Sequence, residues 1–462
     1  MKQNGSISLL VLIFGVVFTV TIGALALFGA VQHQGVRRNA ALQQSLNLAE
    51  SGVNYYRWHL SHDPTDYTDG TQSAGPYTHT VDDAIVPGQF SLTITPPPPG
   101  SSTITVVSTG TTNQYPDITR TITAQFGPRS LASFAFLHNS NIWFGQGTTI
   151  YGDVLVNGGI RMDGTNTGTL SSEKTTYTCG IETGCYPDTE EKPGIWGNGG
   201  PKELWKFPAE KVDFDTISAD FTGMKEKAVS TQSYLAPSGQ QGYHLVFASN
   251  GSVAVSKVTG TDYKKGYSDE NGCEKLYQTI VTEQTVATYQ LASTPVIFAE
   301  DTVWVEGVVK GKTTVVAARL PLDNYNHTIW INNNLTYVTK DGTTHLGLIA
   351  QKDIIIPLSV PTTLEIDGAL LAHRGRVIRH HYRKTNGPHC SSYNEATRNE
   401  LIIYGSIISN QRSYWNFSSP GTNSPSSGFV KRTITYDSHL LYDAPPYFPT
   451  SGIVDLISWN ED

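Results

Sequence analysis

Residues 7–31 read ISLLVLIFGVVFTVTIGALALFGAV, and no Asp, Glu, Lys or Arg lies between Lys2 and Arg37. At 1.5 Å per residue, a helix of this length is about 37 Å long, enough to cross a hydrocarbon core of about 30 Å with some tilt. A secretory signal peptide has a shorter apolar region of about 7–15 residues, and small residues near Gly23-Ala24 leave that alternative open. The length favours a membrane-spanning helix.

The helical pattern continues beyond the apolar stretch. Pro64 is the first proline of the chain, and VRRNAALQQSLNLAESGVNYYRWHL (36–60) carries apolar side chains at spacings of four and three. We therefore predict one helix over residues 6–62, with its first half in lipid and its second half packed on its own head domain or on neighbouring helices. The apolar seam has coiled-coil spacing and consists of Leu42, Leu46, Ala49, Val53, Tyr56 and Leu60.

The N-terminus resembles type IV pilin-like proteins of the PilX-type minor pilin and K-type pseudopilin kind. A short leader with one positive charge, MKQNG, ends in glycine, the apolar helix starts at once, and LNLAESGVNYYRWHL (46–60) is similar to a stretch of those families. The resemblance implies that residues 1–5 are a leader, which a prepilin peptidase cuts between Gly5 and Ser6. Major pilins carry a glutamate at the fifth mature position, where this chain has Leu10. K-type tip pseudopilins lack it too, so the resemblance implies a tip or low-copy position.

Strand patterns follow the helix. Residues 64–88 are rich in turn formers, and three runs then alternate apolar and polar side chains: QFSLTITPP (89–97), STITVVSTGT (102–111) and ITRTITAQFG (118–127). The sequence predicts a neck and a small antiparallel sheet over residues 63–128.

Beyond residue 128 the sequence pattern changes to short runs of β-branched residues that are separated by Gly, Asn and Asp. TPVIFAEDTVWVEGVVKGKTTVVAA (294–318) and TTLEIDGALLAH (362–373) suit the rungs of a parallel β-solenoid, with an antiparallel β-sandwich as the alternative. The fold class that we predict is mainly β with a long N-terminal α-helix. We expect a β-rich head part over residues 129–290 and a solenoid-like C-terminal domain over residues 291–462.

The C-terminal part also resembles an uncharacterised domain that recurs in bacterial PilX-like surface proteins. Its closing pattern stands here as Tyr436-Asp437 followed by Pro445-Pro446-Tyr447-Phe448-Pro449. This resemblance bears on location and assembly and implies no chemistry.

The composition excludes some partners and some kinds of fold. Only 16% of residues are charged, the formal net charge is −8, and no basic stripe occurs, so nucleic acid is not an expected partner. Four cysteines are too few for a disulfide scaffold. Cys179 and Cys185 enclose the short loop GIETG, which a disulfide can close in an oxidising compartment, and Cys273 and Cys390 are a second candidate pair.

Three groups of residues are candidates for chemistry. His380, His381, His389 and Cys390 in RHHYRKTNGPHC match no zinc-ligand spacing, and their basic neighbours repel a cation. The aspartates of KVDFDTISADF (211–221) match no calcium loop and form no identifiable glycosidase pair. Several aromatic residues are either core or part of a sugar-binding face: Trp143, Trp196, Trp205, Tyr243 and Trp304. We expect no catalytic residue, no cofactor and no metal.

The leading interpretation is a minor pilin-like structural subunit of a type IV pilus or related pseudopilus. It would be a single-pass membrane protein whose extracytoplasmic C-terminal domain serves assembly, capping or adhesion at the cell surface or in the pilus. Its expected partners are other pilin-like subunits, the membrane, prepilin peptidase, and a surface polysaccharide or host or cell ligand. The alternatives are a membrane-anchored β-solenoid enzyme acting on polysaccharide, and a single-pass envelope protein outside any filament.

Overall fold

A computed structural model describes residues 6–82, 86–98, 103–214, 220–268, 270–383, 391–418, 425–441 and 443–461. The chain divides into two compact units. Unit 1 comprises Met1–Pro128 and Ile453–Asp462, and unit 2 comprises Arg129–Gly452. The last ten residues thus belong with the N-terminal unit and not with the C-terminal range expected from the sequence. The expected boundary after residue 290 does not coincide with a division between units.

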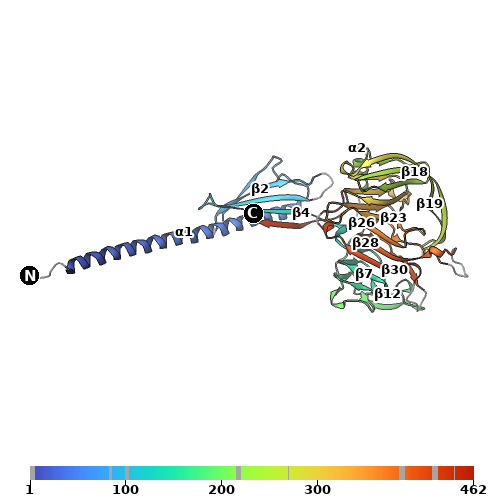
Figure 1. Cartoon of the computed structure of the whole chain (residues 1–462), viewed down its shortest axis with the longest axis horizontal. Helices are drawn as coiled ribbons and strands as arrows, with labels where there is room; N and C mark the ends of the chain where they lie inside the picture. Colours follow the sequence, from blue (N-terminus) through green and yellow to red (C-terminus); the bar gives the residue numbers. More distant parts are fainter. Residues whose placement is uncertain are drawn as a thin grey trace, which may run out of the picture. The chain divides into compact units, whose positions relative to one another are not determined.

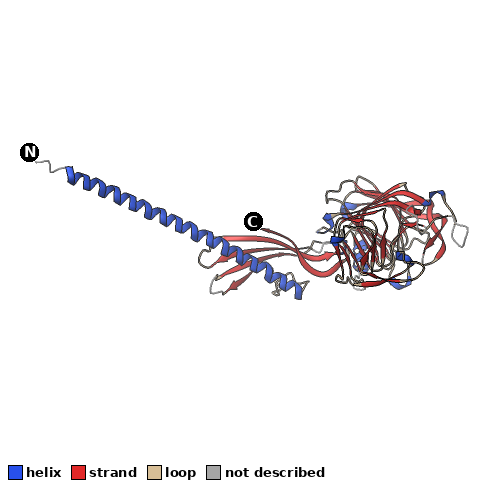
Figure 2. Ribbon diagram, turned by 90° about the horizontal axis from the view of Figure 1, so that it is seen from below, coloured by secondary structure: helices blue, strands red, loops and turns tan. Residues whose placement is uncertain are grey.

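Unit 1 is one long helix and one sheet (Figures 1 and 2). Helix α1 runs over Ser6–His62, the whole range predicted for a single helix. The sheet has the spatial order β1-β2-β3-β4-β31, and β1 to β4 pair antiparallel. Its strands are β1 (Tyr77–Val81), β2 (Gly88–Thr95), β3 (Ile104–Thr112), β4 (Thr119–Ser130) and β31 (Thr450–Glu461).

The second half of α1 packs on this sheet. Ala49, Val53, Tyr56 and Leu60 are buried there, while Leu46 is partly buried in the same core and Leu42 is half-buried. Their partners alternate along the strands, as a period of two requires, and are Phe90, Leu92, Ile104, Val106, Ile122, Ala124 and Phe126. The predicted seam therefore faces the sheet of its own chain.

Two glycines let the helix backbone approach the sheet closely. A Cβ atom on Gly110 of β3 would lie 2.0 Å from the carbonyl oxygen of Ser45, and one on Gly52 of α1 would lie 2.3 Å from the hydroxyl of Ser108. Neither site has room for a side chain, since interiors are close-packed. The glycines determine how deep α1 sits.

Unit 2 is built from ladders of parallel strands. One ladder runs, in spatial order, through β16 (Tyr234–Leu235), β20 (Val296–Ala299), β22 (Lys312–Ala317), β24 (His345–Ala350), β26 (Thr363–Ala372), β28 (Thr397–Ser409), β5 (Phe136–His138), β8 (Val154–Val156), β11 (Leu170–Ser172) and β15 (Trp205–Lys206). Parallel stacking of this kind is what the solenoid interpretation predicts, and an antiparallel sandwich is not formed by these ladders.

Other parallel ladders form the remaining faces. The second runs through β17 (Gly242–Phe247), β21 (Val303–Val309), β23 (Ile329–Tyr337), β25 (Ile354–Ile355) and β27 (Val377–Ile378). A third continues from β28 through β30 (Pro425–Tyr436), β7 (Thr148–Tyr151) and β10 (Thr165–Asn166). A short one joins β6 (Ile142–Phe144), β9 (Ile160–Met162) and β14 (Ile195–Trp196).

Glycines bend the long strands from one ladder into the next. Gly368 of β26 and Gly405 of β28 are in register, with φ of +153° and +143°. A Cβ atom on Gly405 would lie 2.0 Å from the carbonyl oxygen of Gly368. Only glycine takes this backbone conformation without strain. The residues of β28 before Gly405 therefore pair with β30, and those after it pair with β5.

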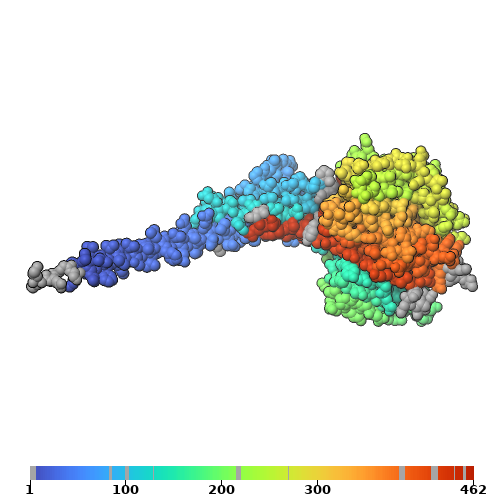
Figure 3. All heavy atoms as spheres, viewed as in Figure 1, coloured from blue at the N-terminus to red at the C-terminus, as the bar shows by residue number. Residues whose placement is uncertain are grey.

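The stack does not follow the order of the chain. The first strands of unit 2, β5 and β7, lie on β28 and β30, the last ones. In Figures 1 and 3 the orange-red strands lie between the yellow and the teal layers. One apolar core runs through the stack from Phe136 to Ile434. The segments before and after residue 290, for which the sequence predicts separate parts, therefore share a core.

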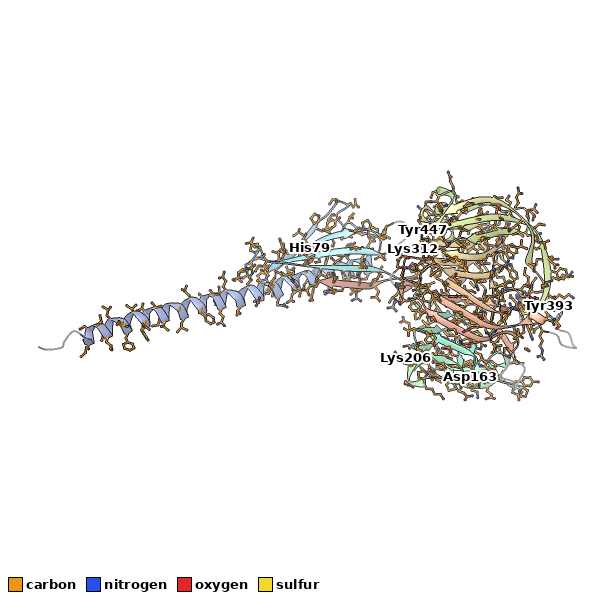
Figure 4. The ribbon with its side chains drawn as sticks, in the orientation of Figure 1. His79, Asp163, Lys206, Lys312, Tyr393 and Tyr447 are labelled. Atoms are coloured by element: carbon orange, nitrogen blue, oxygen red, sulfur yellow. A yellow bond between two sulfur atoms is a disulfide. The ribbon has the colours of Figure 1, made fainter. Side chains whose placement is uncertain are left out.

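A long antiparallel hairpin covers the second ladder. Its strands are β18 (Ser252–Ser268), which pairs with β17, and β19 (Gly272–Gln290). Near its far end the backbone of Tyr267 bridges to His381, and the N–H of Lys265 donates to the hydroxyl of Tyr393 over 2.9 Å (Figure 4). Leu276 of β19 packs in one apolar cluster with Trp304 and Trp330 of the ladder. The hairpin is thus held at both ends over the face of the ladder.

Shorter elements complete the described chain. They are α2 (Phe221–Ser230), β12 (Thr176–Cys179), β13 (Glu190–Pro193), β29 (Asn416–Ser418) and the 3-10 turns at Leu131–Ser133, Ile181–Thr183, Lys202–Leu204, Leu291–Ser293, Leu322–Asn324, Asn394–Ala396 and Ser438–Leu441.

Candidate functional site

The first half of α1 is an exposed apolar surface. Every residue from 7 to 40 is exposed, and the most apolar window of the helix has a mean hydropathy of 2.7. In water such a surface is unfavourable, since burying one large aliphatic side chain is worth about 1.5–3 kcal/mol. The helix is long and apolar enough to be a candidate membrane span.

Polar side chains within this stretch are satisfied by the helix itself. The hydroxyls of Thr19 and Thr21 donate to the carbonyl oxygens of Gly15 and Val17, each over 2.7 Å. A hydroxyl that bonds the preceding turn does not need water, which suits a helix in an apolar surrounding.

The processing residues lie at the start of the helix. Ser6 is the first residue of α1, and Gly5 lies outside the described residues. Leu10, where the resemblance expects a glutamate in major pilins, is an exposed side chain on the apolar stretch. Cleavage after Gly5 remains a prediction.

Two histidine–aspartate pairs hold the loop that follows α1. His59 Nε2 lies 2.8 Å from Asp66 and His79 Nε2 lies 2.6 Å from Asp69; His79 is labelled in Figure 4. Asp66 also accepts from the hydroxyl and the N–H of Thr68 and from the N–H of Gly70. The hydrogen bonds from Thr68 are the main cause that holds the pKa of Asp66 well below its usual range. The loop after α1 is thereby tied back to the helix and to β1.

Two cysteines in unit 2 close a short loop. A disulfide joins Cys179 to Cys185 around the 3-10 turn Ile181–Thr183. Tyr177 packs on it, and Trp196 donates through its indole N–H to the hydroxyl of Tyr177 over 2.7 Å. Cys273 also takes part in a disulfide. Cys390 lies outside the described residues.

The histidines and aspartates of the two candidate motifs that lie in the described part of the chain have structural partners. His380 contacts Glu274 at 3.3 Å and the ring of His381 stacks on Phe417, while His389 lies outside the described residues. Asp220 caps α2 by accepting from the N–H of Gly223. Asp215 is also outside the described part. Among the residues that the structure describes, no group of three His, Cys, Asp or Glu side chains could hold a metal ion.

The aromatic candidates divide between core and surface. Tyr243 and Trp304 are buried, and Trp196 and Trp205 are half-buried. Trp143 is exposed, and its indole N–H donates to Asp163, which is labelled in Figure 4.

Two cavities were not foreseen from the sequence. They measure about 200 and 360 Å³ and lie where β19 passes over β23 and the segment around β25. Their lining comes from strands that are far apart in the chain, so no local motif marks them.

No protein-family model matches the chain, and no curated protein sequence is significantly similar to it. Among solved structures, the chain is similar to the competence-associated pilin ComZ from Thermus thermophilus. The alignment has 14% identity and a TM-score of 0.30, and covers 91% of this chain and 97% of that one. At this score the similarity supports no inference about function.

Proposed function

We propose that this protein is a pilin-like structural subunit, held in the membrane by residues 7–31 before assembly and carrying its β-rich head outside. One observation carries the proposal. A single helix of 57 residues exposes apolar side chains along its first half and packs its second half on an antiparallel sheet of the same unit. The first half of the helix is therefore available for the membrane or for other subunits, and the second half stabilises unit 1.

Two kinds of surroundings can bury the exposed half of α1. Lipid covers it in a single-pass membrane protein, and the same apolar helices of other subunits cover it in a filament. Both remove the apolar side chains from water, so transfer from membrane to filament needs little free energy. Assembly by this helix requires no bond-making chemistry.

A minor position at or near the tip follows from the resemblance at the N-terminus. Leu10 supplies no carboxylate for the amine of a neighbouring subunit. Prepilin peptidase, acting between Gly5 and Ser6, and other pilin-like subunits are the partners that this function needs.

The intact mass of the protein purified from its native membrane tests the proposal. We expect loss of residues 1–5 and a methylated Ser6 at the new N-terminus. Co-purification of other pilin-like subunits is the second expected result. A chain that keeps Met1 to Gly5 and purifies alone would instead identify a free-standing envelope protein.

A further inference from the structure

The larger of the two cavities described above lies beneath the hairpin and is lined by groups from several strands. It measures about 360 Å³, within the range of small-molecule sites. β17 contributes His244, β19 contributes Gln278 and Glu283, β21 contributes Glu306, and β23 contributes Asn332. The exposed Ser359 stands on its rim.

Gln278 lines this cavity, and its amide has a fixed orientation. Its side chain is 2% exposed. Its Oε1 accepts from the N–H of Leu358 over 2.6 Å and from the hydroxyl of Tyr382 over 3.2 Å, which sets the orientation of the amide. The Nε2 group has no hydrogen-bond partner among the described residues. A buried amide donor without a partner costs about 1–3 kcal/mol, so a ligand that accepts from it gains affinity.

Other residues that line the cavity carry hydrogen-bond acceptors. The Oδ1 atom of Asn332 is buried and likewise has no partner within the described chain. His244 lies 2.8 Å from Glu283 and 3.1 Å from Glu306. Burial lowers the pKa of His244, but the nearby carboxylates of Glu306 and Glu283 outweigh burial and raise that pKa above its ordinary value. The carboxylates of Glu283 and Glu306 bring oxygen lone pairs to this wall, which accept hydrogen bonds and never donate them when ionised.

This set of groups selects the chemistry of the ligand. An anion would accept from Gln278 but would be repelled by the two carboxylates. An amine would donate to the carboxylates but could not accept from Gln278. A hydroxyl group both donates and accepts, so a ring carrying several hydroxyls satisfies the amide, the asparagine and the carboxylates together.

We propose that this cavity binds one ring of a neutral saccharide. Gln278 donates to a sugar oxygen, and Asn332 and Glu306 accept from sugar hydroxyls. The site belongs to unit 2 alone and does not depend on processing or assembly of the helix.

The test uses the purified full chain in a detergent without a sugar head group. Methyl glycosides of glucose, galactose, mannose and N-acetylglucosamine are the probes, and saturation-transfer NMR followed by titration is the readout. We expect saturable binding of at least one glycoside. Asn332→Ala and Glu306→Gln should each weaken it about tenfold, the effect of losing one hydrogen bond to a desolvated site.

A bulky residue at the rim separates binding from folding. Ser359→Trp should abolish binding without changing thermal unfolding, because Ser359 is exposed and its hydroxyl donates only to the exposed carboxylate of Glu395 among the described residues. Ser293→Trp, at an exposed serine outside the cavity lining, is the matched control and should bind like the wild type. Absence of saturable binding to every glycoside, or binding that survives Ser359→Trp, would overturn the proposal. Binding of ethylamine in place of the sugars would also overturn it and assign the cavity to cations.

Discussion

Val53 offers a direct test of how the helix and the sheet of unit 1 depend on each other. Its side chain is 1% exposed and lies in the apolar core between α1 and the sheet. Val53→Asp removes an apolar contact worth about 1.5–3 kcal/mol. It also forces an aspartic acid, with an ordinary pKa of about 3.9, to be neutral at pH 7, which costs about 4 kcal/mol at 1.36 kcal/mol per pKa unit.

The sum, about 6–7 kcal/mol, is comparable to the whole stability of many domains, about 5–15 kcal/mol. We therefore expect unit 1 to unfold. Amide hydrogen exchange followed by mass spectrometry should show that β2 and β3 lose protection, while β26 and β28 keep theirs because unit 2 has its own core.

Asn54→Asp is the matched control for Val53→Asp. Asn54 is the next residue along the helix and is exposed, so the same charge should change stability by less than about 0.5 kcal/mol. Equal protection of β2 and β3 in the two variants would refute the reasoning. Because Val53 is buried within unit 1, a charge introduced there disturbs the folding of unit 1 before any contact between subunits. A loss of assembly in such a variant would not by itself identify a contact between subunits.

Three further predictions concern processing, pH and the thiols. Gly5→Leu should block removal of the leader, as measured by N-terminal sequencing. Gly15→Leu is the control and should be cleaved normally, because a Cβ atom at Gly15 meets nothing within 4 Å. Cleavage of both variants would contradict the proposed cleavage site. The depressed pKa of Asp66 stabilises unit 1 above the ordinary pKa of about 3.9, and this contribution is lost as the pH falls through that value and below. Asp66→Ala should therefore lower the free energy of unfolding of unit 1 by about 1.5–3 kcal/mol at pH 7, as measured by urea unfolding. The variant should also show a flatter dependence of stability on pH between about 5 and 2. If the pH dependence were unchanged, the hydrogen bonds from Thr68 would not be the cause of the depressed pKa. Cys179 and Cys185 should resist thiol labelling in the denatured, unreduced native protein, and labelling of all four cysteines would argue against an exported head.

Local sequence patterns determined the elements of this protein. An uninterrupted apolar run followed by a four-three seam specifies α1 over Ser6–His62, because helix periodicity and the absence of proline act within a few turns. Alternation specifies β2 and β3, and the glycines that end LEIDG and LIIYG specify the bends at Gly368 and Gly405, because only glycine adopts that backbone without strain.

Tertiary structure alone decided which elements meet. β5 could stack on any exposed rung with a similar apolar face, and only the packing of the whole core puts it against β28. The return of β31 to the sheet of unit 1 has the same origin, since strand pairing between distant segments depends on the edge that the rest of the fold leaves open. The cavity of Gln278 and Asn332 is a further consequence. Its groups come from separate strands, so only the folded stack of strands brings them to one cavity.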